Sequence, residues 1–360
     1  MRTAIGCISG TSMDGIDVSL VRTDGEARLE PGPGATYPYA PDLRADLLAL
    51  IKEAARAETE PLAELEARVT AAHCTAVERF MADHRIRGSD VVLVGLHGQT
   101  VWHRPQKRFT RQLLDGRSAA QRLGIDVIAR FRHADVAAGG EGAPFAPLYH
   151  RALASALDKP LIVLNLGGVG NVTYVGADTT IAFDTGPASA LIDDWVLRRA
   201  GVPFDDGGRI AAAGRVDEQI LERLMDNPYF GLPAPKSLDR QDFHARAAIV
   251  EPLWLEDGAA TLAAFTIRSV AAALDHVPAA PGRWLVTGGG RLNATFMGGL
   301  ARRLGVPVEP VEAVGWNGDH IEAQCFGYLA VRSLAGLPLS LPTTTGVPQP
   351  MTGGELFRAR

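Results

Sequence analysis

A short glycine-containing stretch near the N-terminus, residues 10–17, combines the residue types that bind phosphate. It lies between two apolar runs, residues 4–8 and 18–21, so we expect it to be the turn between two strands. Its two glycines can adopt positive φ, which leaves backbone N–H groups and two hydroxyls open to a ligand. Asp14 and Asp17 would repel a phosphate unless a hard cation such as Mg²⁺ bridged them. The stretch predicts a phosphate site with magnesium or, alternatively, a glycine-rich hairpin that binds no ligand.

The same pattern returns in the middle of the chain. Residues 161–166 are predicted to form a strand, residues 167–171 a glycine turn and residues 172–175 the returning strand. A third strand, residues 180–183, ends in Asp184. This repetition predicts a duplicated α/β fold, in which two facing lobes grip one polyphosphate between their glycine turns.

A third glycine turn follows a predicted strand over residues 284–287. Here Gly288, Gly289 and Gly290 precede Asn293, which opens the next helix, and the missing side chains would let a flat ring lie against the backbone. The chain has neither a P-loop motif nor a dinucleotide-binding fingerprint. The three turns and the aspartate after a strand therefore favour phosphoryl transfer from a nucleotide held between two lobes.

The spacing of apolar residues predicts the elements that position these turns. Residues 91–96 form a continuous apolar run typical of a strand buried on both faces, and His97–Thr100 would lie at its carboxyl end, where open α/β sheets bind ligands. Glycine-rich residues 139–144 are interpreted as the crossing between the lobes, and the tail after Pro338 as an extended surface segment. Further expected elements are an edge strand at residues 35–39, helices from Pro41 and after Pro61, a helix at residues 118–123, a strand at 125–129, a long helix ending near His276 and a last helix that carries Glu322.

Composition limits the possible functions. The 360 residues are 46% hydrophobic and 21% charged, which is typical of a globular protein large enough for two lobes. The formal net charge of −5, without a basic stripe, argues against nucleic-acid binding. We find neither a signal peptide nor a membrane span, so we expect a cytoplasmic protein. Its three cysteines are far apart and are expected to be reduced, mostly buried thiols.

Six motifs in the chain closely resemble those of the anhydro-N-acetylmuramic acid kinase family. They are Gly10–Asp17, His97–Thr100, Asp135–Gly140, Asn165–Gly168, Phe183–Pro187 and Thr287–Gly290. The resemblance runs from about Ile5 to Leu337. It implies two duplicated ribonuclease H-like lobes of the actin-like ATPase fold around a central cleft, the first formed by residues 1–134 and 338–360 and the second by residues 135–337.

The resemblance also implies an activity and roles for individual residues. The enzyme would use ATP, Mg²⁺ and water to open the 1,6-anhydro ring of anhydro-N-acetylmuramic acid and give N-acetylmuramic acid 6-phosphate during cell-wall recycling; a homodimer is implied as well. Asp184 would be the base that activates water. The implied phosphate contacts are Gly10, Thr11, Ser12, Met13, Asp14, Gly15, Ile16, Asp17, Asn165, Gly167 and Gly168, with Asp14 near Mg²⁺, directly or through water. Gly288, Gly289, Gly290 and Asn293 would bind adenosine, and His97, Gln99, Arg132, Asp135 and Glu322 would lie near the sugar, with Arg132 matching its lactyl carboxylate.

Each of these roles has a simpler alternative. Asp184 could cap the following helix, and Arg132 could form a structural ion pair with Asp135. His97 could be a hydrogen-bonded residue of the sheet end, and Glu322 could lie on a solvated helix face. At the level of function, the alternatives are another small-molecule kinase of the superfamily, acting on an ordinary sugar hydroxyl, and a non-catalytic nucleotide switch like actin or a chaperone ATPase lobe.

Overall fold

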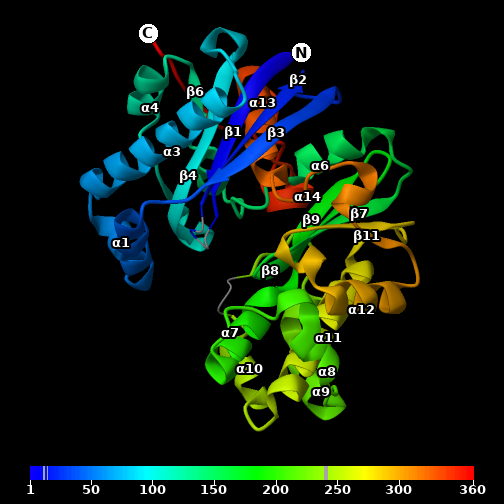
Figure 1. Cartoon of the computed structure of the whole chain (residues 1–360). Helices are drawn as coiled ribbons and strands as arrows, with labels where there is room; N and C mark the ends of the chain where they lie inside the picture. Colours follow the sequence, from blue (N-terminus) through cyan, green and yellow to red (C-terminus); the bar gives the residue numbers. More distant parts are fainter. Residues whose placement is uncertain (11–12, 14, 239–241) are drawn as a thin grey trace. The chain divides into compact units, whose positions relative to one another are not determined.

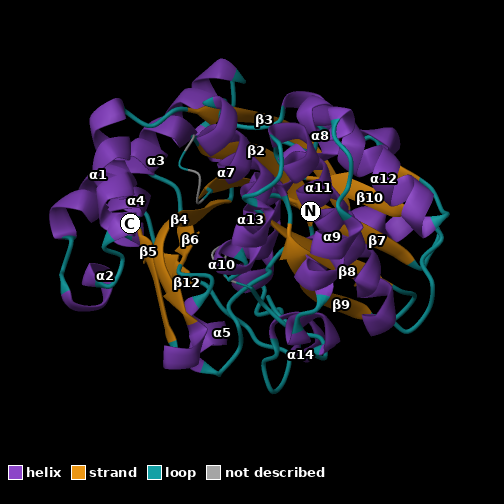
Figure 2. Cartoon of the chain, turned by 90° about the horizontal axis from the view of Figure 1, so that it is seen from below, coloured by secondary structure: helices purple, strands orange, loops and turns teal. Residues whose placement is uncertain are grey.

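The computed structural model describes residues 1–10, 13, 15–238 and 242–360, and it divides the chain into two compact units. The first unit comprises Met1–Ser155 and His320–Arg360, and the second comprises Ala156–Asp319. Figure 1 shows the elements along the chain, and Figure 2 shows sheets flanked by helices. The chain passes between the units after Ser155 and again after Asp319, so these boundaries differ from the expected ones at residues 134 and 337.

The sheet of the first unit is built around its first strand. Its strands are β1 (Arg2–Ser9), β2 (Ile16–Thr23), β3 (Leu29–Tyr37), β4 (Leu93–Arg104), β5 (Phe109–Leu113), β6 (Val127–Ala129) and β12 (Glu355–Phe357). They follow the order β12-β6-β4-β1-β2-β3, and β5 pairs with β4. β1 and β2 pair in antiparallel fashion, which confirms the predicted strand–turn–strand unit. On its other edge, β1 is parallel to β4.

Helix α13 is placed by a close approach to this sheet. The helices of the unit are α1 (Pro41–Lys52), α2 (Arg56–Thr59), α3 (Ala63–Asp83), α4 (Gly116–Leu123), α5 (His133–Ala137), α6 (Pro147–Leu153), α13 (Ile321–Leu334) and α14 (Pro342–Thr345). Gly6 on β1 and Gly95 on β4 are register partners, and both face α13. A Cβ on Gly6 would lie 1.8 Å from the carbonyl oxygen of Ala323, and one on Gly95 would lie 2.3 Å from that of Phe326. Only glycines allow this contact, which explains why α13 belongs to the first unit.

The sheet of the second unit repeats that of the first. Its strands are β7 (Leu161–Leu166), β8 (Val169–Val175), β9 (Thr180–Pro187), β10 (Trp284–Thr287) and β11 (Val308–Pro310), in the order β11-β10-β7-β8-β9. β7, β8 and β9 are antiparallel neighbours, and β10 is parallel to β7 and to β11. In the first unit, the neighbouring strands β6-β4-β1-β2-β3 show the same succession of parallel and antiparallel pairs. The predicted α/β fold with two duplicated ribonuclease H-like units is therefore confirmed.

Helix α11 forms the centre of the helical layer in the second unit. The helices are α7 (Ser189–Ala200), α8 (Arg209–Ala213), α9 (Glu218–Met225), α10 (His244–Ala247), α11 (Leu255–Ala271) and α12 (Ala294–Leu304). α11 packs against α7, α8, α9 and α12, and a 3₁₀ turn continues it to His276, as predicted. Its small residues allow close packing, for example where Gly258 contacts the ring of Trp195, which is fully buried.

Two segments differ from the prediction. β4 continues beyond the apolar run to Arg104 and forms a hairpin with β5, so His97–Thr100 lies inside the strand and not at its end. Gln99 is nevertheless the register partner of Ser9, the last residue of β1. The C-terminal tail does not simply cover the surface, because β12 joins the sheet beside β6.

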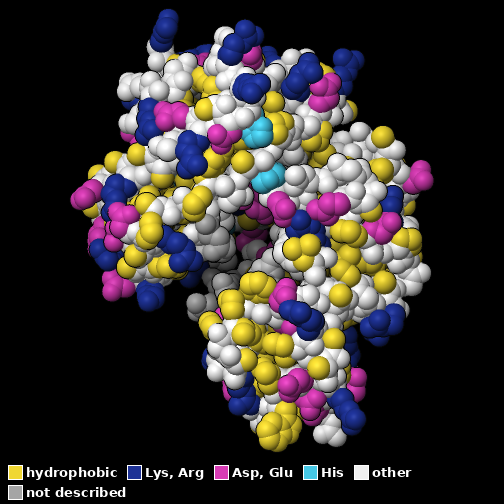
Figure 3. Space-filling model, in the orientation of Figure 1, with side chains coloured by type: hydrophobic (Ala, Val, Ile, Leu, Met, Phe, Trp, Pro, Cys, Tyr) yellow, Lys and Arg dark blue, Asp and Glu magenta, His cyan; other side chains and the backbone are white. Residues whose placement is uncertain are grey.

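The thiols agree with the expectation from composition, and charges of both signs occur on the surface (Figure 3). On the face shown in Figure 3, acidic and basic side chains are interspersed, without a stripe of one sign. All three cysteines are buried free thiols, and burial raises their pKa values, that of Cys74 to about 11. None of the helices in the described part of the chain has both the length and the apolar character needed to cross a membrane.

Candidate functional site

The turn between β1 and β2 is held by contacts to its backbone. Gln99 is fully buried; its amide nitrogen donates to the carbonyl of Gly10 (3.3 Å), and its Oε1 accepts from the hydroxyl of Ser9 (2.7 Å). Arg44 donates to the carbonyl of Met13 (3.0 Å), whose side chain is buried in the core. Gln99, expected near the sugar, is therefore occupied in fixing the glycine turn.

Several predicted phosphate contacts belong to this turn. Thr11, Ser12 and Asp14, including the expected contact of Asp14 with Mg²⁺, lie outside the described residues. Gly15 packs against Thr36, and the side chain of Ile16 is buried. The carboxylate of Asp17 accepts from the hydroxyl of Thr36 (2.6 Å). In the described part of the turn, Asp17 is thus the residue whose side chain brings negative charge to the site.

Arg132 and His97 form a hydrogen-bonded pair. Nδ1 of His97 lies 2.9 Å from the carbonyl of Gly98, which can only accept, so this nitrogen carries the hydrogen. Nε2 of His97 then accepts from Nε of Arg132 (2.8 Å), and Nη1 of Arg132 donates to the carbonyl of Gly142. Burial lowers the pKa of His97 well below its ordinary value, and the Arg132 charge adds to this. Both ring nitrogens of His97 therefore bond to protein groups. His97 positions Arg132 and has no ring nitrogen left for a ligand.

Asp135 is a buried anchor and forms no ion pair with Arg132 among the described residues. One carboxylate oxygen accepts from the N–H of Gly142 (2.7 Å). The other accepts from the hydroxyls of Ser340 and Thr345. The carboxylate thus ties the glycine-rich segment 139–144 to the C-terminal segment, both within the first unit. The alternative of an Arg132–Asp135 bridge is wrong, and Asp135 fixes the loop that positions Arg132.

Glu322 stands at the start of α13, near the charges of Arg132 and Asp17. Desolvation raises the pKa of its carboxyl, the charge of Asp17 raises it further, and Arg132 opposes both effects. The side chain is exposed, so solvent screens these interactions. Glu322 is thus accessible to solvent, as the alternative interpretation expected, and it also belongs to the same charged group as Arg132 and Asp17.

The second glycine turn, between β7 and β8, is closed by the start of α7. The carbonyl of Gly168 accepts from the N–H groups of Ala188 (3.0 Å) and Ala190 (3.3 Å), and that of Gly167 accepts from Ser189 (2.9 Å). In the described chain, the N–H groups of Gly167 and Gly168 themselves donate to no protein acceptor. The carbonyls are therefore occupied while two N–H donors stay available for an anion.

The third glycine turn, after β10, packs directly on the end of β7. A Cβ on Gly288, whose φ is +75°, would lie 2.4 Å from Oδ1 of Asn165, and one on Gly290 would lie 2.5 Å from Cβ of Leu166. A Cβ on Gly289 would meet nothing within 4 Å. Gly288 and Gly290 are thus needed for packing, and Gly289 is the open position.

Asn293 and Asn165 connect this turn to its surroundings. Oδ1 of Asn293 accepts from the N–H of Phe296 (3.1 Å) and caps α12. Asn165 is the register partner of Thr287, so the structure brings the predicted phosphate and adenosine residues of the second unit side by side. Arg291 donates to the carbonyl of Gly288 (3.1 Å) and to the carboxylate of Asp319 (2.7 Å), which holds the turn in place.

Asp184 lies on β9, the last strand in the order of its sheet, and is clamped by the segment that follows α9. Its N–H donates to the carbonyl of Lys236 (2.9 Å), its carbonyl accepts from the hydroxyl of Tyr229 (2.6 Å), and its Oδ2 accepts from the N–H of Leu238 (2.9 Å). The first N–H groups of α7 are used by the glycine turn between β7 and β8. The alternative in which Asp184 caps α7 is therefore wrong.

Sequence reasoning missed the two residues that hold this clamp, Tyr229 and Lys236. They lie in a turn-rich region without apolar periodicity, where no motif marks a link to Asp184. In such a region a lysine is normally interpreted as a surface residue, and a tyrosine does not by itself indicate burial. Pro235, directly before Lys236, is typical of a turn, but it does not indicate that the carbonyl of Lys236 pairs with β9.

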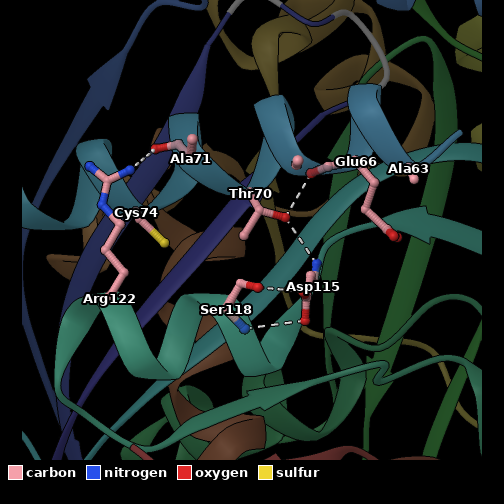
Figure 4. A pocket seen from close by; sticks show the side chains of 9 residues that line it. Ala63, Glu66, Thr70, Ala71, Cys74, Asp115, Ser118 and Arg122 are labelled. Atoms are coloured by element: carbon pink, nitrogen blue, oxygen red, sulfur yellow. Dashed lines mark hydrogen bonds between the residues drawn. The ribbon is translucent and has the colours of Figure 1, made fainter.

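A pocket of about 270 Å³ lies elsewhere, between α3 and α4 of the first unit. Figure 4 shows its hydrogen-bonded wall, where the hydroxyl of Thr70 accepts from the N–H of Asp115 and Asp115 caps α4. Arg122 donates to the carbonyl of Ala71 and to Glu78. Thr70, Asp115 and Arg122 thus have hydrogen-bond partners within the protein, and none of the predicted site residues lines this pocket.

Comparison with known proteins identifies the family. A profile of the family described as anhydro-N-acetylmuramic acid kinase matches residues 2–359. A relative of that name from Rhodospirillum rubrum is 51% identical over 358 residues, covering 99% of this chain and 94% of the relative. Another from Acidiphilium cryptum is 52% identical over 359 residues, covering 99% and 98%. A solved structure, component A of the (R)-2-hydroxyglutaryl-CoA dehydratase of Acidaminococcus fermentans, aligns over 93% of this chain and 100% of that chain with a TM-score of 0.49 and 12% identity.

The profile match extends over nearly the whole chain, and the two relatives align over 94% and 98% of their own length. The resemblance found in the six motifs is thereby confirmed for the chain as a whole. The chain belongs to the anhydro-N-acetylmuramic acid kinase family.

Proposed function

We propose that this kinase consumes ATP and water to convert 1,6-anhydro-N-acetylmuramic acid into N-acetylmuramic acid 6-phosphate and ADP, with Asp184 as the base. Family membership supports the kinase activity and the sugar substrate. The observation that carries the role of Asp184 is its clamp, because three hydrogen bonds fix the backbone and one carboxylate oxygen of this residue. A base must be held in place in this way if it is to act on one water molecule.

Apart from one proton transfer, the reaction breaks two bonds and forms two. The oxygen of water bonds to the anomeric carbon while the bond from that carbon to O6 breaks. O6 then bonds to the γ-phosphorus as the bond between that phosphorus and the bridging oxygen of ADP breaks. Asp184 accepts a proton from the water. An ordinary inverting glycosidase needs a second carboxyl group to protonate the leaving oxygen, whereas here the phosphoryl group captures it.

Nucleotide binding is supported by the donors of the glycine turns. The N–H groups of Gly167 and Gly168 suit phosphate oxygens, and the open position at Gly289 suits the adenosine. We propose that the turn between β1 and β2 also binds phosphate. Mg²⁺, when bound, would offset the charge of the phosphates, and in the described part of this turn Asp17 supplies the hard oxygen donor that suits it.

Sugar binding is supported by the group around Arg132. Among the described residues, Nη2 of Arg132 has no hydrogen-bond partner, while its other nitrogens are held by His97 and Gly142. A guanidinium fixed in this way suits the lactyl carboxylate that distinguishes muramic acid from other amino sugars. Glu322 would contact sugar hydroxyls, and Gln99 and Asp135 would act through the loops they hold. A homodimer in the cytoplasm, working in cell-wall recycling, completes the proposal.

The proposal is tested by turnover in H₂¹⁸O. We expect ATP consumption that depends on 1,6-anhydro-N-acetylmuramic acid, and one ¹⁸O per product, located at the anomeric carbon and absent from the phosphate ester. N-Acetylmuramic acid in the same water, without enzyme, is the control for exchange at that carbon.

Other outcomes would favour the alternatives. Phosphorylation of an ordinary hydroxyl without ¹⁸O would indicate another sugar kinase. ATP hydrolysis at a rate that no sugar changes would indicate a nucleotide switch.

A further inference from the structure

Lys236 carries a partly buried charge that the proposed chemistry leaves unexplained. Its ammonium group donates to the carbonyls of Tyr229 (3.0 Å) and Phe230 (3.2 Å), and it lies 3.1 Å from Nε2 of His276. The rings of Tyr229 and Phe183 flank it, with centroids 4.9 Å and 5.8 Å away. Its surroundings are thus carbonyls, an imidazole and aromatic faces, and no carboxylate forms an ion pair with it in the described chain.

Three of these residues, Phe183, Tyr229 and Lys236, are also linked to Asp184. Phe183 precedes Asp184 on β9, Tyr229 donates its hydroxyl to the carbonyl of Asp184, and the carbonyl of Lys236 accepts from its N–H. Two residues after Lys236, the N–H of Leu238 donates to Oδ2 of Asp184. The ammonium therefore ties the segment 236–238 to the 3₁₀ turn that carries Tyr229, and both of these contact Asp184.

We propose that Lys236 is a positioning residue for Asp184: its ammonium group, bound to the carbonyls of Tyr229 and Phe230, keeps the N–H of Leu238 aimed at the Asp184 carboxylate. The inference rests on the proposed role of Asp184 as the base. Removal of the ammonium would release the segment and move the carboxylate, with little effect on the glycine turns that suit ATP.

A purely structural role explains this arrangement less well. Partial burial of an ammonium among neutral groups costs free energy, and here it lowers the pKa of Lys236 to about 8. A methionine of similar length would fill the space without that cost. The charge of Lys236 is explained if the orientation of the segment 236–238 matters for catalysis. An ammonium group has three N–H donors, so it can hold the carbonyls of Tyr229 and Phe230 at the same time.

The test compares Lys236→Met with Lys159→Met, a lysine of the same unit that donates to the carbonyl of Leu157. We expect Lys236→Met to lower kcat by about 10- to 100-fold, as misplacement of a catalytic group does, with the KM for ATP unchanged within about twofold. A hydrogen bond to a carboxylate favours its charged form, so the acid limb of the kcat profile should also move up by about half a pH unit or more. Lys159→Met should leave kcat and the acid limb of its pH profile unchanged.

Two further variants make every outcome decisive. Tyr229→Phe removes a hydroxyl from the same clamp and should show the same split between kcat and KM, and it replaces Lys236→Met if that variant does not fold. Lys236→Arg keeps the donors and should recover part of kcat. If Asp184→Asn is inactive but both Lys236→Met and Tyr229→Phe have a normal kcat and pH profile, the inference is overturned. If Asp184→Asn is active, the proposed function itself is refuted.

Discussion

Nε of Arg132 donates to Nε2 of His97 across 2.8 Å, and this bond fixes both the tautomer of the imidazole and the plane of the guanidinium. Burial, together with the charge of Arg132, keeps His97 neutral by lowering its pKa. His97 thus stays an acceptor at physiological pH, and Arg132 presents its remaining donors in one direction.

Arg132 should distinguish sugars by their lactyl carboxylate. We expect Arg132→Met to lower kcat/KM for 1,6-anhydro-N-acetylmuramic acid by about 100-fold, the loss typical of a charge-assisted contact. For 1,6-anhydro-N-acetylglucosamine, which lacks the lactyl group, the same change should matter less than about threefold. Steady-state kinetics with both sugars measures the difference, and equal losses for the two would argue against a carboxylate contact.

Gly289 should be the glycine of the third turn that senses the nucleotide. A Cβ there meets no protein atom within 4 Å, so Gly289→Ala should keep the melting temperature of the native protein. If the adenosine lies against this backbone, the methyl group should weaken ATP binding by about tenfold or more, or about 1.4 kcal/mol. Calorimetric titration with a non-hydrolysable ATP analogue measures this.

Gly288→Ala is the matched control for that variant. Its Cβ would lie 2.4 Å from Oδ1 of Asn165 at a φ of +75°, so we expect a loss of stability that Gly289→Ala does not show. Unchanged nucleotide affinity in Gly289→Ala would mean that the adenosine lies elsewhere.

Asp135 should contribute mainly to stability. Its buried carboxylate accepts from Gly142, Ser340 and Thr345, so Asp135→Asn replaces charge-assisted bonds with weaker ones and leaves a donor facing donors. We expect the free energy of unfolding to fall by about 2 kcal/mol, measured by urea denaturation. Glu355→Gln, which removes an exposed ion pair with Arg130, should cost less than about 1 kcal/mol. A sugar KM that rises in Asp135→Asn without any loss of stability would favour direct substrate contact instead.

The strand order could be predicted largely because each unit repeats one pattern. Continuous apolar runs mark β4 and β7, and the glycine turns mark where β1 and β7 reverse. The end of β4 was missed because its apolar run stops at Leu96 while the pairing with β5 continues to Arg104. Hairpin pairing of that kind depends on partners that single-strand periodicity does not reveal.

The site could be predicted only where a motif marks it. Asp184 was singled out because it stands in the motif Phe183–Pro187 at the end of an apolar run; it lies within β9, and its role as the base stays a prediction. The clamp of Lys236 and Tyr229 arises from a long loop that returns to β9, and such contacts between distant residues leave no periodic signal. Likewise, the sequence does not indicate that the carboxylate of Asp135 accepts hydrogen bonds from the C-terminal segment and forms no ion pair with Arg132 in the described chain.

Stability should depend on pH through His73, a fully buried residue of α3. Burial lowers its pKa to about 4, whereas the unfolded chain has about 6.5, so the unfolded state binds more protons between these values. Stability is therefore complete above about pH 6.5 and is lost as the pH falls towards 4. We expect His73→Leu to reduce the difference in unfolding free energy between pH 7 and pH 5 by about 2 kcal/mol.

Denaturant titrations at both pH values measure this contribution. His84→Leu, at the exposed end of the same helix, is the control and should keep the dependence of the native protein. A pH dependence that stays unchanged in His73→Leu would show that His73 is not the group responsible.

The most direct test of the central claim, that Asp184 activates the attacking water, is single-turnover kinetics of Asp184→Asn together with its affinity for a non-hydrolysable ATP analogue. The variant keeps the size of the side chain but removes the base. We predict that product formation slows by at least about a thousandfold, within the range expected for loss of a general base, while the dissociation constant of the analogue stays within about twofold. Product formation within tenfold of the native rate, or nucleotide affinity lost in parallel with activity, would contradict the account.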